Sequence, residues 1–439
     1  MADGYSKTKP LLLSHSDNTG GASIAAYRAH QALLSSGIDS KLWVNSKGTM
    51  DPTVESFAGP VSKLKSRIRT ESGRLLPSLL FSDDSPTQRS FNLFNSKWVD
   101  RINNDDSDIV NVQWVHREMM SIKDIGRISK PMVLTMQDMW SFCGAEHYTQ
   151  DRRWSDSYSR KSRRNGASQL SGFDIDRWTW LRKKRYWNNS MQIVAISRWL
   201  ADCAANSSLF ANNPITVIPN PIDVSVWKPM EKTVARRIWN LPENKRIITF
   251  GAVGGTRQPR KGYAFLDEAL ERLRLKFDDI HLVVYGQSEP SSRGVDIFPT
   301  TYVGSLKDSV SMCVLNNASD VYVHPALQEA FGQTVSEAQA CGVPVVAFDS
   351  SGVTDIVNHK STGYLAQVGS SEELAKGIEW VFEQQADNER AQRLANKARR
   401  RIVEKFSYAQ VGEAYLDLFS AVLDSNRSKK QALGAKESY

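Results

Sequence analysis

The sequence has few cysteines and lacks the motifs of several common protein classes. Its four cysteines are widely spaced and form no C-x-x-C pair, which argues against a disulfide framework or a zinc site and favours a reducing compartment. No apolar run approaches the roughly 20 residues of a membrane-spanning helix, and the polar residues 1–10 do not resemble a secretory signal. No G-x-G-x-x-G dinucleotide fingerprint follows the first predicted strand. From the cysteine spacing and from the absence of a secretory signal and of a membrane-spanning run, we expect a cytoplasmic protein.

The composition is that of a globular protein with a basic balance. Of its 439 residues, 41% are hydrophobic and 24% are charged, and this length suggests about two or three domains. The formal net charge is +8, which attracts phosphates, nucleic acids or anionic lipid headgroups without choosing among them. Peripheral membrane contact is compatible with this charge. We expect no nucleic acid partner, because no motif for one is present.

Short apolar segments alternate with helical patterns along the whole chain. Such alternation is typical of parallel sheets that are covered by helices on both faces. Because it occurs in both halves of the sequence, we predict an α/β protein with two doubly wound, Rossmann-like domains, whose ligands bind at the carboxyl ends of the strands. The predicted strands are 10–14, 41–44, 109–112, 132–135, 192–196, 215–218, 246–250, 280–285, 320–323 and 344–348.

A proline-rich segment marks the predicted boundary between the two domains. The segment 219–223 reads PNPID, and its two prolines interrupt both helix and strand. We therefore assign 1–218 to an N-terminal domain and 219–403 to a C-terminal domain. A last amphipathic helix is predicted at 404–425, packing back toward the N-terminal domain, and the polar tail 426–439 is predicted to be disordered.

The segment 152–185 is unusually rich in lysine, arginine and tryptophan. It forms the centre of a predicted insertion at about 150–187. One interpretation is a long solvated insertion, and the other is a surface that meets an anionic acceptor or a membrane. Asp174 and Asp176 have Asp-x-Asp spacing, but they lie in this insertion rather than after a strand, so we do not predict a metal clamp there.

The segment 325–344, PALQEAFGQTVSEAQACGVP, has the most specific pattern in the sequence. Glu329 and Glu337 enclose seven residues. Glu337 lies about one turn inside a predicted helix, where a carboxylate can accept hydrogen bonds from ribose hydroxyls. Glu329 lies in the preceding loop and can reach a hexose or a diphosphate. Either glutamate alone could equally be an ordinary charge at a helix end, stabilised by the helix dipole.

The residues between the two glutamates predict a phosphate site. Gly332 has no Cβ, so the backbone beside it can approach a ligand closely. The amides of Gln333 and Thr334 then belong to a helix N-terminus, which binds phosphate through its N–H groups and its dipole. Phe331 precedes this turn, and we include it among the candidate donor-binding residues.

This run resembles the E-x7-E signature of retaining glycosyltransferases, in particular glycosyltransferase family four, the group 1 type. The resemblance extends to the Gly20-Gly21 loop, the 219–223 segment and the final helix. It implies the GT-B fold, in which two Rossmann-like domains face each other across a cleft. It also implies a hexosyltransferase of glycan biosynthesis. A nucleotide-diphosphate sugar would bind the C-terminal domain, and a glycan, lipid-linked or protein acceptor would bind the N-terminal domain.

In the family, the glycine-rich loop at 251–262 supplies a lysine and an arginine to the donor diphosphate. Lys261 matches the lysine. The usual arginine position is Thr256 here, so Arg260 or Arg257 would have to take its role. Two cations beside a leaving diphosphate stabilise the negative charge that grows as the glycosidic bond breaks. Without the resemblance, this segment would be interpreted as a glycine-rich surface turn with solvated basic residues.

The resemblance assigns several further residues. In the family, the backbone at Gly304 and Leu306 holds the nucleotide base. The loop with Gly20 and Gly21 approaches the donor phosphate or the acceptor, although small residues could equally serve a plain strand-to-helix turn.

Gln137 stands where the closest branch of the family commonly has a histidine that contacts the transferred sugar. An amide hydrogen-bonds but does not titrate, so a strict histidine proton shuttle is not expected here. His147 and His116 follow in loops, where a single histidine is more often structural or exposed than catalytic.

The resemblance implies a front-face displacement without a protein nucleophile. The acceptor hydroxyl would attack on the side from which the diphosphate leaves, and Glu329, Lys261, Arg260 and Gln137 are the predicted catalytic residues. We expect no cofactor and no metal. The alternative is a non-catalytic or altered nucleotide-sugar-binding protein of the same fold, which Gln137 and the shifted arginine favour slightly.

Overall fold

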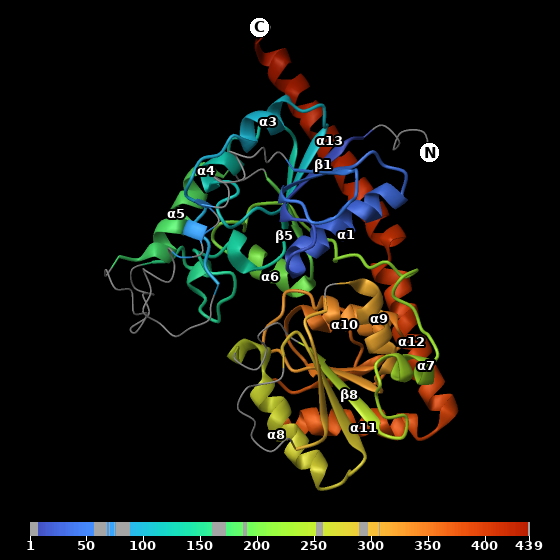
Figure 1. Cartoon of the computed structure of the whole chain (residues 1–439). Helices are drawn as coiled ribbons and strands as arrows, with labels where there is room; N and C mark the ends of the chain where they lie inside the picture. The colour runs from blue at the N-terminus through green and yellow to red at the C-terminus, as the bar shows by residue number, and fades with distance from the viewer. Residues whose placement is uncertain are drawn as a thin grey trace. The chain divides into compact units, whose positions relative to one another are not determined.

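The computed structural model shows two compact units, each built on one sheet of parallel strands (Figure 1). Unit 1 comprises Met1–Pro221 with Tyr408–Tyr439, and unit 2 comprises Ile222–Ser407. The structure describes residues 8–56, 68–69, 71–73, 75, 88–159, 173–187, 191–251, 258–288, 297–306 and 308–437. The predicted α/β class with two Rossmann-like domains is confirmed.

Unit 1 contains a seven-stranded sheet in the order β3-β2-β1-β4-β5-β6-β7, with parallel pairing throughout. Its strands are β1 (Pro10–Ser16), β2 (Lys41–Ser46), β3 (Val54–Glu55), β4 (Ile109–Trp114), β5 (Met132–Met136), β6 (Gln192–Ala195) and β7 (Ile215–Val217). Its helices are α1 (Gly21–Ser35), α3 (Trp98–Asn104), α4 (Ile122–Ile125), α5 (Ile175–Tyr186), α6 (Arg198–Ala205) and α13 (Tyr408–Glu437), with 3-10 turns η2 (Met139–Ser141) and η3 (Arg153–Ser155).

The two ends of unit 1 in the sequence share one hydrophobic core. β1 is buried along its whole length, as expected for a central strand of a parallel sheet. Leu12 pairs in register with Leu42 of β2, and both belong to a cluster that also contains Leu33 of α1 and Tyr415 and Phe419 of α13. α13 therefore packs beside α1 on this sheet.

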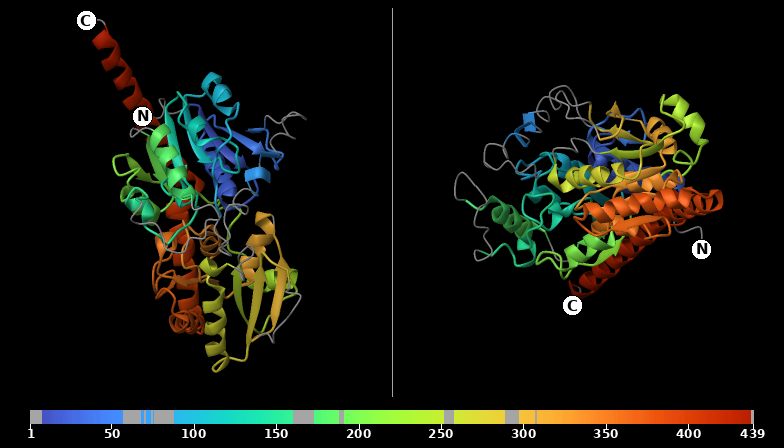
Figure 2. Two further views of the ribbon diagram at one scale, coloured as in Figure 1. Left: turned by 90° about the vertical axis from the view of Figure 1, so that its left-hand side faces the viewer. Right: turned by 90° about the horizontal axis from the view of Figure 1, so that it is seen from below.

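α13 is longer than the sequence pattern suggested. It begins at Tyr408 and continues to Glu437, so the prediction of disorder from 426 onward is wrong for 426–437. The residues there, such as Lys429, Lys430 and Gln431, are good helix formers, and an existing helix extends easily because its costly nucleus is already formed. The last turns project away from the rest of unit 1 (Figure 2).

Unit 2 contains a six-stranded parallel sheet in the order β10-β9-β8-β11-β12-β13. Its strands are β8 (Arg246–Gly251), β9 (Ile280–Tyr285), β10 (Thr300–Gly304), β11 (Val321–His324), β12 (Val345–Phe348) and β13 (Gly363–Ala366). Its helices are α7 (Lys232–Ile238), α8 (Tyr263–Arg274), α9 (Ser309–Ala318), α10 (Gln333–Ala340), α11 (Ser371–Gln385) and α12 (Asn388–Phe406), with 3-10 turns η6 (Pro259–Lys261) and η7 (Ser351–Asp355).

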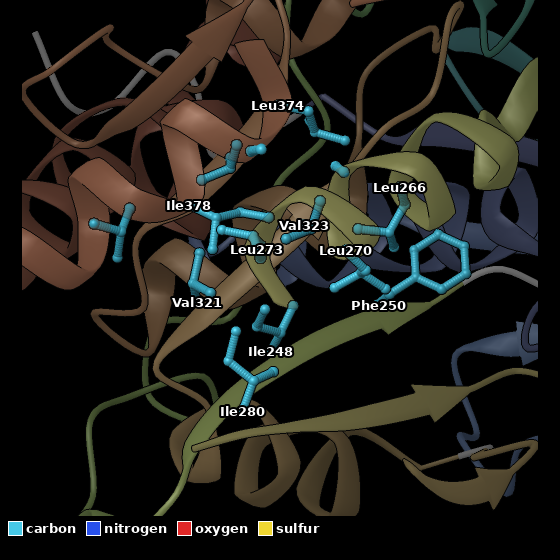
Figure 3. Packing of buried hydrophobic residues seen from close by; sticks show 14 of the residues in the cluster. Ile248, Phe250, Leu266, Leu270, Leu273, Ile280, Val321, Val323, Leu374 and Ile378 are labelled. Carbon is cyan, nitrogen blue, oxygen red and sulfur yellow. The ribbon is translucent and has the colours of Figure 1, made fainter. Parts of the chain in front are cut away.

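The core of unit 2 lies between its sheet and the helix pair α8 and α11 (Figure 3). Ile248 and Phe250 of β8 point toward Leu270 of α8, and Ile378 of α11 belongs to the same cluster. Apolar residues at helical spacing on α8 and α11 meet the alternate residues of the strands, which is how such layers bury their faces. None of the described helices is long and apolar enough to cross a membrane.

The chain passes between the units at two points that lie side by side. Ile222 donates its backbone N–H to the carbonyl oxygen of Phe406 (2.8 Å) and forms a parallel bridge with Ser407. The first passage falls inside the predicted boundary segment 219–223. The second falls at Ser407, which ends α12 rather than beginning the last helix.

Candidate functional site

The predicted donor residues of unit 2 meet where the strand order of its sheet reverses. β8 lies between β9 and β11, so the connections that follow β8 and β11 leave toward opposite sides. Such a switch point at the carboxyl ends of parallel strands is where doubly wound sheets bind ligands. η6, in the connection after β8, carries Arg260 and Lys261, and Glu329 lies in the connection after β11. Arg257 lies outside the described residues.

Lys261 and Glu329 form an ion pair although 68 positions separate them in the sequence. Lys261 Nζ lies 2.6 Å from Glu329 Oε2, and Arg260 Nη1 lies 3.9 Å from the same oxygen. Burial would raise the pKa of Glu329, but the charges of Lys261 and Arg260 outweigh it and lower the pKa to about 2. The carboxylate is therefore ionised at any ordinary pH.

Backbone contacts hold the two connections together. Arg260 donates from Nη1 to the carbonyl oxygen of Gln328 (2.6 Å), and its own carbonyl accepts from the N–H of Leu327 (2.8 Å). Gly262 has φ +69°, and an added Cβ would lie 1.8 Å from the carbonyl oxygen of Pro325. Only glycine fits so close an approach, which explains the glycine that follows Lys261.

His324 belongs to this cluster and was missed in the sequence. It ends β11 and is buried. Its Nε2 lies 3.9 Å from Glu329 Oε2 and has no hydrogen-bond partner among the described residues. Burial lowers the pKa of His324 to about 4, so the ring is neutral at pH 7. Its position at the carboxyl end of a strand, directly before Pro325, is the sequence signal that could have identified it.

α10 presents its N-terminus directly after this connection. Gly332 precedes the helix with φ +102°, and its carbonyl accepts the N–H groups of Val335 (3.0 Å) and Ser336 (3.1 Å). Gln333 and Thr334 form the first turn, whose amides have no acceptor within the helix itself. A helix N-terminus therefore lies where the sequence predicted a phosphate site.

Phe331 does not fit its predicted role as a donor contact. Its side chain is buried and meets Phe406 of α12 edge to face, with 5.7 Å between the ring centroids. It fills the core beneath α10, because an aromatic ring before a helix gains more from burial than from exposure. Only its backbone borders the candidate site.

Glu337 is buried one turn inside α10. Its charge acts on a pair of tyrosines at the ends of β9 and β11, Tyr285 and Tyr322, whose hydroxyls lie 3.0 Å apart. Burial, with a smaller contribution from Glu337, raises the pKa of Tyr322 to about 12. Glu337 therefore lies close enough to this tyrosine pair for its charge to act on both hydroxyls.

The predicted base-binding backbone lies at the end of β10. Gly304 has φ +68°, and its carbonyl accepts from the N–H of Gly286 (2.7 Å). An added Cβ at Gly304 would meet no described atom within 4 Å, so a glycine is needed there for backbone conformation rather than for space. Leu306 follows and is half-buried.

In unit 1, Gln137 follows β5 and is held by an amide network. Its Nε2 donates to Gln113 Oε1 (2.9 Å) and to Asn220 Oδ1 (3.1 Å), and Asn220 Nδ2 donates back to Gln137 Oε1 (3.1 Å). All three side chains are buried. The network fixes the orientation of the amide; Asn220 lies in the segment 219–223 that the sequence analysis singled out, whereas nothing in the sequence pointed to Gln113.

Gly20 and Gly21 lie in the connection after β1. Gly20 has φ +86° and begins α1, and both glycines are exposed. The connection is anchored by Asp17, whose carboxylate accepts the backbone N–H groups of Gly48 (2.8 Å) and Thr49 (2.9 Å). The two glycines therefore border the switch point between β1 and β4.

His147 and His116 are buried rather than exposed. His147 Nδ1 lies 2.6 Å from Asp138 Oδ2, and its Nε2 lies 2.8 Å from Ser90 Oγ. His116 stacks edge to face on Trp140 at 4.2 Å between centroids. Among the described residues, His116, Asp138 and His147 are the one group whose donor atoms lie close enough to share a metal ion. Here Asp138 bonds His147 directly and accepts from Trp114 Nε1 (3.2 Å), whereas His116 Nδ1 has no hydrogen-bond partner among the described residues.

The acidic pair in the basic insertion has structural contacts. Asp174 caps α5 by accepting the N–H of Arg177 (3.0 Å), and it pairs with Arg153. Asp176 is buried and accepts from the N–H of Ala145 (3.3 Å). Lys183 of the same helix is fully buried and donates to the carbonyls of Trp140, Cys143 and Gly144. Part of the basic segment therefore belongs to the core of unit 1.

Comparison with known proteins finds one family whose sequence model matches most of unit 2. Residues 231–401 match the sequence model of the family described as glycosyl transferases group 1. The matched range contains η6, the Lys261–Glu329 pair and the whole of α10. Unit 2 is thus similar in sequence to the group 1 glycosyltransferases over residues 231–401.

Curated relatives match part of the chain. A phosphatidyl-myo-inositol mannosyltransferase of Propionibacterium freudenreichii is 31% identical over 42% of this chain and 46% of its own length. A GDP-mannose-dependent alpha-mannosyltransferase of Mycolicibacterium smegmatis is 34% identical over 31% of this chain and 34% of its own length. The chain thus spans about half or less of the length of these relatives.

Solved structures match the fold over nearly the whole chain. Sucrose-phosphate synthase from Thermosynechococcus elongatus superposes with a TM-score of 0.63 at 18% identity, covering 94% of this chain and 100% of that one. HepE of Anabaena, solved in complex with UDP and glucose, gives a TM-score of 0.61 at 16% identity, covering 94% and 99%. The GT-B fold predicted from the resemblance is confirmed.

Proposed function

We propose that this protein is a retaining glycosyltransferase that transfers a hexose from a nucleotide-diphosphate sugar to a hydroxyl acceptor. The observation that carries the proposal is the cluster at the switch point of unit 2. Lys261 lies 2.6 Å from Glu329, with Arg260 beside them, and the same connection leads into the N-terminus of α10. Fixed cations together with a helix N-terminus suit a diphosphate and the charge it gains when it leaves.

The mechanism we propose is front-face displacement. The acceptor hydroxyl attacks the anomeric carbon on the face from which the diphosphate departs, and a diphosphate oxygen takes the hydroxyl proton. Lys261 and Arg260 stabilise the departing diphosphate, and Glu329 keeps Lys261 in place. His324 is neutral at pH 7 because burial lowers its pKa to about 4, so its ring offers hydrogen bonds rather than charge.

The proposal includes independence from metal ions and from any cofactor. Two protein cations already lie at the proposed diphosphate position, and they provide the charge that a divalent ion provides in other transferases. Asp174 and Asp176, which have Asp-x-Asp spacing, make structural contacts in unit 1 instead.

The acceptor is proposed to be a glycan, a lipid-linked precursor or a protein. α5 supports a lipid-linked acceptor at an anionic membrane, because it exposes Trp178 and Leu181 beside arginines and lysines. Binding to vesicles of anionic phospholipid should weaken in Trp178→Ser and in high salt. Equal sedimentation with neutral and anionic vesicles would contradict membrane contact through this helix.

Release of nucleotide from a donor panel tests the proposed function. UDP-, GDP-, ADP- and dTDP-sugars are incubated with the protein in EDTA, and free nucleotide is measured. We expect slow hydrolysis of one donor that is lost in Glu337→Ala. Donor binding without release, even with candidate acceptors present, would favour a non-catalytic sugar-nucleotide-binding protein. Absence of both binding and hydrolysis would overturn the assignment of Glu329, Glu337 and Lys261 to a donor site.

A further inference from the structure

Two of the four cysteines of the chain lie against each other in unit 2. Cys313 of α9 and Cys341, which ends α10, are free thiols whose sulfur atoms are 3.7 Å apart. Both side chains are nearly buried, with exposed fractions of 7% and 4%. The other two cysteines, Cys143 and Cys203, belong to unit 1. Nothing in the proposed transfer reaction uses this pair.

Cys313 lies among polar groups: its thiol donates to the carbonyl oxygens of Val226 (3.3 Å) and Lys228 (3.6 Å), and its thiolate is the reactive form of cysteine. The Asn317 amide Nδ2 lies 3.5 Å from its sulfur. A hydrogen bond with Cys341 outweighs burial and, with the Asn317 amide and the Arg399 charge, lowers the pKa of Cys313 to about 6. The same contact raises the pKa of Cys341. Cys313 is thus the nucleophile of the pair, and Cys341 is the neighbouring thiol that can complete a disulfide with it.

We propose that Cys313 and Cys341 form a redox modification site that closes to a disulfide and, through α10, weakens donor binding. The oxidant is a small organic disulfide. The Cys313 thiolate attacks one of its sulfurs, the S–S bond breaks, and one thiol leaves with a proton. Cys341 then loses its proton and attacks the Cys313 sulfur, which releases the second thiol. Two protein thiols are oxidised, and one small disulfide is reduced to two thiols.

α10 connects this site to the donor residues. A disulfide requires about 2.05 Å between its sulfurs, so closure must shorten the present sulfur–sulfur distance of 3.7 Å between Cys313 of α9 and Cys341 at the end of α10. Cys341 donates its N–H to the carbonyl of Glu337 (3.3 Å), and Gly332 begins the same eight-residue helix. A short helix moves as a rigid body, because its backbone bonds are all internal. In this proposal α10 moves with Cys341 on closure, and the carboxylate of Glu337 and the amides after Gly332 move with it.

The cross-link is tested on the full chain with hydroxyethyl disulfide as the oxidant. Non-reducing peptide mass spectrometry should identify a linked pair of peptides that contain Cys313 and Cys341, and thiol titration should fall from four to two. Cys203→Ser is the matched control, since it removes a half-exposed cysteine of unit 1 and should leave the cross-link intact. Cys341→Ala and Cys341→Ser should both abolish it. A linked peptide between other cysteines, or none, would overturn the modification site.

The effect on the donor site is measured by two readouts. The coupling to donor binding rests on the proposed function, so calorimetry with the bound sugar nucleotide should show at least tenfold weaker binding after oxidation, reversed by dithiothreitol and absent in Cys341→Ala. Amide hydrogen exchange across 325–341 should also change on oxidation, whether or not a donor binds. Failure of the reduced protein to bind any donor would count against the proposed function alone. A cross-link that leaves exchange unchanged would overturn the coupling.

Discussion

A buried carboxylate between two cations determines much of the behaviour of unit 2. Glu329 and Lys261 expose only 16% and 20% of their side chains, so removing one charge leaves the other poorly solvated. Lys261→Met should raise the pKa of Glu329 and lower the stability of unit 2 by roughly 2 kcal/mol. Thermal unfolding measures the loss. Lys276→Met removes the exposed pair with Glu379 and should cost less than about 1 kcal/mol. Equal losses would contradict the buried role of Lys261.

A second residue whose neighbours determine its chemistry is Gln137, whose amide is held by hydrogen bonds. Its Nε2 is the donor to two carbonyl oxygens, those of Gln113 and Asn220. Gln137→Glu replaces this donor with a carboxylate oxygen, so it should destabilise unit 1 by roughly 1–3 kcal/mol and lower the apparent melting temperature. The double variant Gln137→Glu/Asn220→Asp carries a second carboxylate in the network. At pH 8 it should be less stable than the single variant, and at pH 4 it should recover part of that stability. Unchanged melting of both variants would argue that the network contributes little.

At the scale of elements, the start of α10 depends on one backbone conformation. Gly332 has φ +102°, and an added Cβ would lie 3.3 Å from Val353 Cγ2. Gly332→Ala should therefore cost about 1–3 kcal/mol of stability and weaken donor binding further, because the amides after it change direction. Gly369→Ala is the control: φ is +75° there, but an added Cβ meets nothing closer than 3.9 Å. Equal donor affinity in the two variants would show that Gly332 has no role beyond strain.

The sequence predicted elements more readily than it predicted their partners. Alternation revealed most strands of both sheets, because a buried parallel strand is a continuous apolar run. β13 was missed, since its four residues, GYLA, are short and begin with glycine. The tail was misjudged because a polar composition is common to disordered segments and to exposed helices. The order of strands and helices followed from the alternating pattern. The prolines of 219–223 marked the first passage of the chain between the units, which falls after Pro221.

For the candidate site, the sequence revealed residue types but not all pairings. Lys261 and Glu329 were identified from separate motifs, and only the structure shows their 2.6 Å contact. His324 and Gln113 were not assigned to the site, because each becomes meaningful only when folding brings a distant side chain beside it. Phe331 was assigned wrongly, since a motif does not distinguish a side chain facing the ligand from one facing the core.

At the scale of the whole molecule, buried neutral histidines link folding to pH. Burial lowers the pKa of His15, His30 and His324 to about 4, whereas each would titrate near 6.5 in the unfolded chain. Between pH 6.5 and pH 4 the unfolded state therefore binds more protons than the folded state, and stability must fall as the pH falls through this window. Each histidine contributes at most about 3 kcal/mol to this loss.

The loss should be largely complete at pH 4, below which both states bind the same protons at these positions. His30 bonds Ser40 and Thr53 through its two ring nitrogens, so His30→Gln retains hydrogen-bonding groups without a titrating ring. Melting temperatures measured from pH 7.5 to pH 4 should fall less steeply in this variant than in the unaltered protein, because the variant lacks the His30 ring, which takes up a proton on unfolding. The exposed substitution Lys276→Met should leave the slope unchanged. Identical slopes in His30→Gln and the unaltered protein would mean that His30 is charged in the folded state, which would require rearrangement around its hydroxyl partners.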